Sequence, residues 1–361
     1  ACGVVLHYLK DTEHANLQHI STLQRIVATE FMWMDRFTIR NLELVHSTYD
    51  QGTNLLQAID HTHTPMGARL MKRWMIFPLF DINRIEQRLN LVNHFILEQN
   101  LNHSLTHLVK QIGDVERLVG KIPLKKINPR EVMQLAKSLS FMEEMRTQCM
   151  SSSDTSLQAL AGPLLPMPEL QQTIRNTIID DAPAMASKGG MIREGISEEL
   201  DQLRKISRHG KDYLLQIQQN EAQKTGISSL KISYNNVFGY YLEVTHTHKD
   251  KVPAEWIRKQ TLANAERYIT PELKEYEEKI LGAEDKILVI EMEIYQQLLV
   301  TIEPYISPIQ NNAHITAQLD CLLCFAYNAH KYNYHRPEVV NEPVLDIKAG
   351  RHPVIEQQLP A

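Results

Sequence analysis

Basic and amide side chains gather in one part of the chain, between residues 235 and 264. Lys and Arg side chains attract the phosphates of duplex DNA whatever the base sequence, and Asn, Gln and Thr side chains fix a phosphate in position through short hydrogen bonds. Side chains of these types could together contact a phosphate backbone without reading bases. The candidate contact residues are Asn235, Lys249, Lys251, Arg258, Lys259, Gln260, Thr261 and Asn264. The ordinary alternative for such a charge run is a solvated basic face.

The charge of the whole chain limits where such a site can lie. The 38 Lys and Arg residues stand against 43 Asp and Glu residues, which gives a net charge of −5 and a pI near 6.4. This balance excludes a protein that adheres to nucleic acid through overall positive charge. Within the candidate segment, Lys and Arg outnumber Glu243, Asp250 and Glu255, so a DNA site has to be confined to it.

Three pairs of side chains have spacings that metal sites use. They are His61 with His63, His246 with His248, and Cys321 with Cys324. Zinc takes such ligands in sets of three or four, and the sequence adds no further ligand to either histidine pair. The two cysteines lie in an apolar run, where a spacing of three places both thiols on one side of a helix as core residues. We therefore predict no metal site.

Nucleotide chemistry is also not expected. A phosphate-binding P-loop needs an upstream glycine and a Ser or Thr after its Gly-Lys pair, and neither Gly120-Lys121 nor Gly210-Lys211 has them. The acidic residues between positions 272 and 278 complement the positive end of a helix rather than forming a catalytic pair. The expectation is a chain with no catalytic residues and no bound cofactor, and therefore not an enzyme.

Helices must supply most of the framework for this site. Thr64 caps a helix that opens with a proline and ends before Pro78, and Asn128 opens another in which Glu131 completes a capping box. Between residues 150 and 190, serine, glycine and proline divide the chain into loops and short helices.

Two long helical arms flank the candidate segment. Apolar residues recur every three or four positions from Ile196 to Ile217, which marks one face of a long helix. The same spacing runs from Leu273 to Leu298, so a helix starting after Pro271 would extend about 45 Å.

Between the arms the pattern becomes strand-like. Residues 230–245 predict a β-hairpin that turns at Asn235-Asn236, and residues 258–269 predict one further strand. The expected fold is mainly α, a helical bundle with two long antiparallel arms and a small inserted β-rich (α+β) sheet at their tip.

Length and composition set the remaining limits. With 361 residues and 43% hydrophobic residues, the chain is expected to form two or more packing units. No apolar run approaches the roughly 20 residues that cross a bilayer, and four cysteines suit a reducing compartment, so the default location is the cytoplasm. The first residues are interpreted as a cut inside a longer chain, and short extended segments are expected after Arg336.

Seven blocks of sequence follow one another along nearly the whole chain. They are DRFTIRNLEL at 35–44, TPMGARLMKRW at 64–74, IGDVERL at 112–118, residues 189–204 with their EELD core, FGYY at 238–241, QTLANAERYITPEL at 260–273 and GRHP at 350–353. Their order and spacing resemble those of the bacterial MutS family of DNA mismatch-repair proteins. The resemblance implies a fragment that covers the lever (core) and clamp domains of such a protein.

The resemblance implies a division of the chain. A lever domain would occupy residues 1–212 and 273–335, a clamp domain 213–272, and the truncated start of an ATPase domain 336–361. It also implies, for the longer protein, ATP with Mg²⁺, a MutL-type repair partner, a second MutS subunit and a place in the bacterial cytoplasm near the nucleoid.

Parts of the family's machinery are expected to lie outside this sequence. Mismatch reading uses a Phe-x-Glu motif in a domain that would precede Ala1, and ATP hydrolysis uses a P-loop that would follow Ala361. Phe141-Met142-Glu143 fits the first motif by its letters but lies in a helical stretch far from the expected place, which favours core packing.

The chain departs from its relatives at two positions. Many carry lysine before the asparagine of the clamp motif, where this chain has Ala263, so phosphate contact by Asn264 is less supported unless Arg258 or Lys259 compensates. Ile196 replaces an aromatic residue on what is expected to be an apolar helix face.

The leading hypothesis is a part of a mismatch-repair protein that contacts double-stranded DNA through its backbone, independently of sequence, and links that contact to ATPase domains. The alternative is a helical scaffold for protein partners with no DNA binding of its own. A metal-dependent hydrolase is a third class, for which the sequence supplies no adequate ligand set.

Overall fold

The computed structural model describes residues 2–12, 30–235, 237 and 239–359, and it divides into two compact units. Unit 1 comprises Ala1–Asn176 and Leu298–Ala361, and unit 2 comprises Thr177–Gln297. The expectation of more than one packing unit is therefore confirmed. The boundaries at residues 212, 272 and 335 that the family resemblance implies remain predictions.

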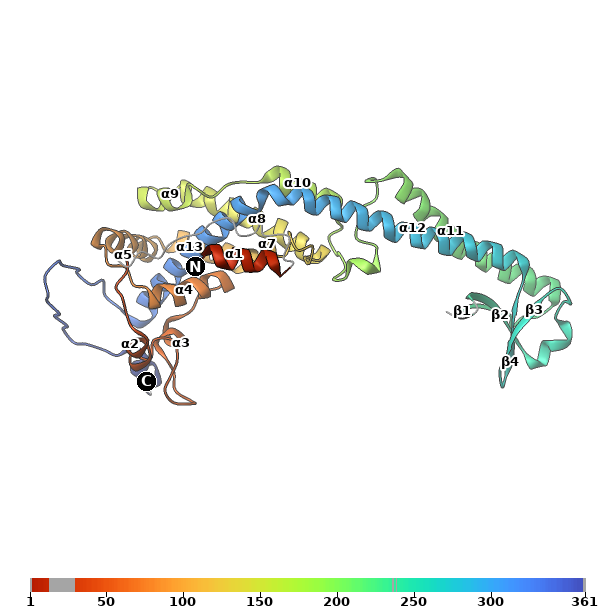
Figure 1. Ribbon diagram of the computed structural model, residues 1–361, viewed down its shortest axis with the longest axis horizontal. Helices are drawn as coiled ribbons and strands as arrows, with labels where there is room; N and C mark the ends of the chain where they lie inside the picture. The colour runs from red at the N-terminus through yellow and green to blue at the C-terminus, as the bar shows by residue number, and fades with distance from the viewer. Residues whose placement is uncertain (1, 13–29, 236, 238, 360–361) are drawn as a thin grey trace. The chain divides into compact units, whose positions relative to one another are not determined.

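Unit 1 is built around one long helix, α13. Its helices are α1 (Cys2–Asp11), α2 (Arg36–Asn41), α3 (Leu55–Ile59), α4 (Pro65–Ile76), α5 (Ile82–Leu97), α6 (Gln99–Gln111), α7 (Val115–Gly120), α8 (Pro129–Met150), α9 (Thr155–Ala161), α10 (Pro168–Thr177), η3 (Glu303–Tyr305), α13 (Ile306–Tyr332) and α14 (Pro353–Gln358). α13 packs against α4, α5, α6 and α7 (Figure 1). Fifteen of its residues are buried, on all sides, as expected for a central core helix.

The predicted helix starts are confirmed. Thr64 accepts a hydrogen bond from the Gly67 amide at 2.9 Å, with Pro65 in the first turn of α4. Asn128 and Glu131 form the reciprocal capping box at the start of α8. These caps satisfy backbone amides that have no partner within the helix.

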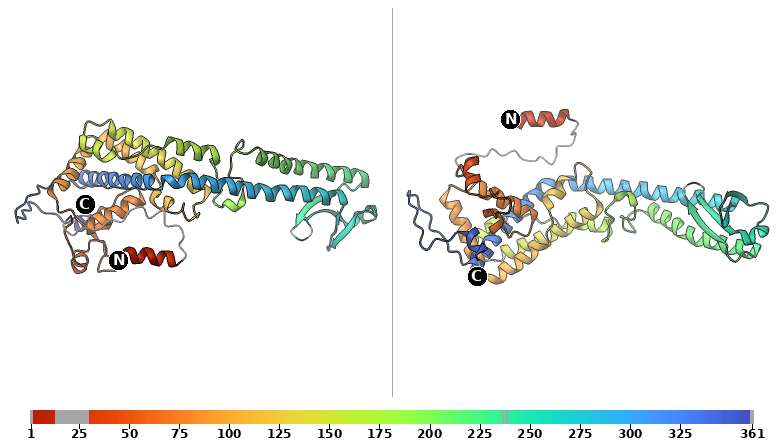
Figure 2. Two further views of the ribbon diagram at one scale, coloured as in Figure 1. Left: turned by 45° about the horizontal axis from the view of Figure 1, so that its top comes forward. Right: turned by 90° about the horizontal axis from the view of Figure 1, so that it is seen from below.

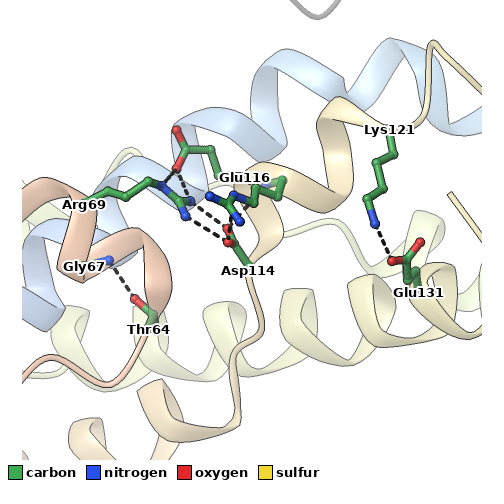
Figure 3. A network of polar contacts seen from close by, with 8 residues as sticks. Thr64, Gly67, Arg69, Asp114, Glu116, Lys121 and Glu131 are labelled. Carbon is green, nitrogen blue, oxygen red and sulfur yellow. Dashed lines mark hydrogen bonds and ion pairs between the residues drawn. The ribbon is translucent and has the colours of Figure 1, made fainter. Parts of the chain in front are cut away.

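A polar network joins α4 to the start of α7 (Figure 3). The Arg69 guanidinium donates to both carboxylate oxygens of Asp114, at 2.9 and 2.7 Å, and also contacts Glu116. Beside it, Lys121 is ion-paired with Glu131. The lysine of the Gly120-Lys121 pair therefore holds a carboxylate of α8.

Unit 2 is dominated by two helices that lie side by side and run antiparallel (Figures 1 and 2). They are α11 (Glu198–Thr225) and α12 (Pro271–Ile302), of which residues up to Gln297 belong to this unit. The Ser207 hydroxyl of α11 lies 3.3 Å from Glu284 of α12, and Tyr213 donates to Glu272 at 2.9 Å. The predicted pair of long antiparallel arms is confirmed.

A four-stranded antiparallel sheet lies at the end of this pair where α11 finishes and α12 begins (Figure 1). The strands are β1 (Lys231–Asn235), β2 (Gly239–Thr245), β3 (Ile257–Thr261) and β4 (Ala265–Ile269), in the order β1-β2-β4-β3, with the 3-10 helix η2 (His246–Lys251) between β2 and β3. One further 3-10 helix, η1 (Ala186–Lys188), precedes α11. The predicted hairpin is confirmed.

The prediction of a single strand over residues 258–269 is wrong. This stretch forms two strands, β3 and β4, joined by a tight turn in which the Leu262 amide donates to the Ala265 carbonyl at 2.8 Å. The turn lacks both glycine and proline, which are the residues that mark most turns in a sequence. Asn264 is the one strong turn former in it.

The sheet and the helix pair share one apolar core. Leu214 and Ile217 of α11 and Leu273 of α12 pack with Leu242, Val244 and Tyr268 of the sheet and with Trp256. Burial of this cluster fixes one face of the sheet against the helices, because apolar surface removed from water stabilises the folded state.

Two further expectations fail. Ile196 precedes α11 instead of lying in it, and its side chain is 42% exposed. No strand forms in residues 333–352, and the segment after His352, where extended structure was expected, is helix α14, with Pro353 at its start. Among the described helices, none is long and apolar enough to cross a membrane.

Candidate nucleic-acid interface

The register of the sheet separates the candidate residues into two groups. Asn235 pairs with Gly239 at one end of the sheet, whereas Thr245 pairs with Ala265 at the opposite end. Thr261 and Asn264 lie at this second end, where β3 stops and the β3–β4 turn begins. Asn235 is therefore apart from the other candidates.

The second end of the sheet is organised by contacts between η2 and the β3–β4 turn. The His246 amide donates to the Asn264 carbonyl at 3.3 Å, and its ring Nε2 lies 3.0 Å from the Leu262 carbonyl oxygen. Lys251, at the end of η2, donates to the Gly226 carbonyl at 3.3 Å, beside the C-terminus of α11. We name this end of the sheet the distal surface; its members are Lys249, Lys251, Lys259, Thr261, Ala263 and Asn264, all of them exposed.

Glu266 controls the charge beside this surface. Its side chain is only 2% exposed, and it accepts from Lys249 at 3.0 Å while Arg258 lies 3.5 Å away. The hydrogen bonds from Tyr268 and Lys249 lower the pKa of Glu266, so the carboxylate is charged at neutral pH. Two of the four predicted cations are thus held by one buried anion, although more than half of each cationic side chain stays exposed.

The excess of basic over acidic residues around the sheet is smaller than the sequence prediction implies. Residues 213–272 contain seven Lys and Arg residues and six Asp and Glu residues, a difference of +1. The sequence prediction sets the basic residues against Glu243, Asp250 and Glu255 alone, and the buried Glu266 adds a further negative charge. Among the described residues, Lys259 has no ion-pair partner, and the register shift between Arg258 and Gln260 places it in an irregular part of β3. Lys259 is the most available cation of the predicted set.

Gln260 and Arg267 belong to an internal network on the sheet. Arg267 donates to Gln260 at 2.8 Å and to Glu243 at 3.3 Å, and its guanidinium lies 4.4 Å from the centre of the Tyr241 ring. Gln260 is half-buried and its carbonyl oxygen is engaged. Its side chain serves cross-strand pairing in this structure, a role that the sequence does not distinguish from phosphate contact.

Asn235 also has a local structural role. Its side-chain oxygen accepts from the Val237 amide at 3.0 Å, the geometry by which asparagine stabilises turns. Gly239, its strand partner, has φ +73° and leaves no room for a Cβ against Glu277. Asn236, the second residue of the predicted turn, lies outside the described residues, and Asn235 stabilises the chain where β1 ends.

The cysteine pair and the Phe-Met-Glu triplet have structural roles as well. Cys321 and Cys324 are buried in α13, where their thiols donate to the carbonyls of Gly67 and Ile59, and burial raises the pKa of Cys324 to about 12. Met142 of the Phe-Met-Glu triplet is 1% exposed in α8, as core packing predicts. Within the described residues, no group of three or more His, Cys, Asp or Glu side chains could hold a metal ion.

Comparison with known proteins gives one consistent result. The family model of MutS domain III matches residues 37–326. The DNA mismatch repair protein MutS of Cytophaga hutchinsonii is 52% identical over 360 residues, that of Bacteroides thetaiotaomicron 51% and that of Flavobacterium johnsoniae 50%, each over 100% of this chain. The chain spans 42% of the length of each of these three relatives.

Proposed function

We infer that this chain, which belongs to the MutS domain III family, serves DNA mismatch repair by binding duplex DNA through the distal surface of unit 2. The contact is to the phosphate backbone and is independent of base sequence. The observation that carries the proposal is the gathering of exposed cationic and hydrogen-bonding side chains on one end of the sheet. Side chains of these types bind phosphates and fix the protein on the duplex.

The candidate residues differ in how exposed they are and in whether their side chains already serve the sheet, so we expect them to contribute unequally to DNA contact. Lys259, Thr261 and Asn264 are exposed and lie on the β3–β4 hairpin, and Lys249 and Lys251 stand beside them on η2. Arg258 contributes through the exposed part of its side chain. Gln260 and Asn235 support the sheet and its turn, and we expect little direct contribution from them.

In the longer protein, α11 and α12 would link this contact to ATPase domains. That protein would be an ATPase using ATP and Mg²⁺, would act with a MutL-type partner and a second MutS subunit, and would work in the bacterial cytoplasm on nucleoid DNA. Its relatives carry the name of DNA mismatch repair proteins, which supports this assignment.

Salt-dependent binding of duplex DNA tests the proposal. The logarithm of the binding constant falls linearly with the logarithm of salt concentration, with a slope of about −0.9 per phosphate contact. We expect weak binding by the 361-residue chain at low salt, because its net charge is −5. Replacing Lys249, Lys251 and Lys259 by alanine should reduce the magnitude of the slope by about 2–3 in fluorescence anisotropy titrations.

A matched variant separates this contact from the effect of net charge. Lys72, Lys126 and Lys137 are exposed residues of unit 1, and their replacement by alanine removes the same three charges. This control should leave the slope within about 0.5 of the unmodified chain, which is less than one phosphate contact. Equal losses in both variants would contradict the proposal. No binding even at low salt would favour the scaffold alternative.

A further inference from the structure

Unit 1 contains a cavity of about 850 Å³ that the proposed DNA contact does not use. Its walls come from α3, α4, α5 and α13, and residues 334–337 and Pro353 form one further side. Sites for small organic ligands are usually clefts of about 300–1,000 Å³ with mostly apolar walls and a few polar groups. The walls here are mostly apolar; they include Leu55, Ile59, Met71, Leu89, Val92 and Ala329.

A cation lies on an aromatic stack in the wall of this cavity. The Arg88 guanidinium carbon is 3.5 Å from the centre of the Trp74 ring, and Trp74 stacks on Phe325 with ring centres 6.2 Å apart. Arg88 and Trp74 also line a neighbouring cavity of about 550 Å³. No carboxylate of the described residues forms an ion pair with Arg88, in contrast to Arg69 and Arg204.

The environment of Arg88 is unfavourable for an unpaired charge. Burial, together with the charge of Arg84, lowers the pKa of Arg88 to about 10, and the group remains protonated at neutral pH. Removing a cation from water without a counter-ion is costly, and the Trp74 ring offsets only part of that cost. An anion placed against the guanidinium would offset more.

A second polar group in the same wall lacks a partner. Asn328 is 3% exposed and lines the cavity. Its amide nitrogen donates to the Ile59 carbonyl at 2.7 Å, whereas its side-chain oxygen has no hydrogen-bond partner. Unsatisfied buried acceptors are uncommon in folded proteins. This oxygen is closed off from water, so it takes no part in ligand contact.

We propose that this cavity is a binding site for a small organic anion with an apolar, ring-containing body. The acidic group would pair with Arg88, and the body would lie among the apolar side chains of α4, α5 and α13. The site is independent of the proposed DNA contact, which lies in the other unit.

Two related fluorescent probes test the proposal on the 361-residue chain. Anilinonaphthalene sulfonate has an apolar ring system, an N–H donor and a negative charge, and N-phenylnaphthylamine matches it without the charge. We expect saturable binding of one molecule of the sulfonate. Arg88→Gln should weaken it roughly tenfold, because a charge-assisted contact is lost, and should change the affinity of the neutral probe less than twofold.

Two further variants complete the design. Ala329→Trp narrows the cavity and should weaken the binding of both probes, whereas Arg73→Gln removes an exposed charge outside the cavity walls and should change neither. Circular dichroism and thermal unfolding establish that each variant is folded. The proposal is overturned if Arg88→Gln leaves sulfonate binding unchanged, if it weakens both probes equally, or if Ala329→Trp changes the affinity of neither probe.

Discussion

At the scale of single residues, the distal surface depends on one buried carboxylate. Glu266 holds Lys249 and Arg258 through ion pairs, and its own position is fixed by Tyr268, which donates to it. A cation that is paired to a protein carboxylate attracts a phosphate less strongly, since the two charges partly cancel outside the protein. DNA contact by this chain should therefore depend most on cations that Glu266 does not reach.

The Ala263→Lys variant tests this argument by adding such a cation. Ala263 is exposed in the β3–β4 turn, next to Asn264, so a lysine there would project from the distal surface without displacing a neighbour. One added phosphate contact should steepen the salt slope by about 0.9 and raise the affinity roughly 3–10-fold near 0.1 M salt. Anisotropy titrations over a range of salt concentrations measure both quantities.

The control for that variant is Ala254→Lys. Ala254 is exposed between η2 and β3, outside the turn, and a lysine there changes the net charge equally. It should change the slope by much less than one phosphate contact. If both lysines raise the affinity to the same extent, the gain reflects net charge, and the turn is not a contact.

The sequence predicts the candidate residues of this site better than their roles. Residue type identifies side chains able to bind phosphate, and it places Lys259, Thr261 and Asn264 correctly on an exposed surface. It does not show that Gln260 is engaged by Arg267, because that contact depends on the pairing of β3 with β4. Nor does it show that Glu266 points into the protein toward two cations.

At the scale of elements, a buried ion pair joins the two long helices, and both of its members also form hydrogen bonds with the loop before α11. Glu291 of α12 is fully buried; it accepts from Arg204 of α11 at 2.7 Å and from the Met191 amide at 3.1 Å. Arg204 also donates to the Ile192 carbonyl at 2.7 Å. Gly189, with φ +66°, brings this loop close to Leu288 of α12. The contacts hold α11 and α12 in a fixed register.

Removing one member of this pair should be costly. Arg204→Ala leaves the Glu291 carboxylate buried without its cation, which typically destabilises a protein by about 3–5 kcal/mol. The matched control is Arg208→Ala, one turn further along α11, where the partner Glu194 is exposed and the expected loss is below about 1 kcal/mol. Urea unfolding, followed by circular dichroism, measures both losses. Similar losses would contradict a special role of the buried pair.

The elements themselves are largely predictable from local patterns. The caps at Thr64 and Asn128 and the three-four spacing of the two long arms give helices where the structure has them. The prediction fails where local signals are weak or depend on distant packing. The β3–β4 turn lacks glycine and proline, and Ile196 lies outside α11 because Ser197 caps the helix after it.

At the scale of the whole molecule, the cationic surface is a small feature of a chain with a net negative charge. The family resemblance and the fold class are confirmed, since the MutS domain III model covers residues 37–326 and the structure is mainly helical with one small sheet. Sequence periodicity predicts the arms and the inserted sheet, whereas the division into units at residues 176 and 297 follows from packing that no local pattern contains.

The composition of the distal surface leads to the last prediction, that the 361-residue chain does not discriminate matched from mismatched duplexes. Discrimination needs side chains that read base edges, or a bend in the DNA that a mismatch makes less costly. The cationic and hydrogen-bonding members of the distal surface are three lysines, a threonine and an asparagine, which suit phosphates along an unbent duplex. Competition titrations with a matched duplex and a G·T duplex should give affinities within about twofold and equal salt slopes. A preference above about fivefold would mean that this chain reads or bends DNA by itself, and backbone contact alone would no longer describe its function.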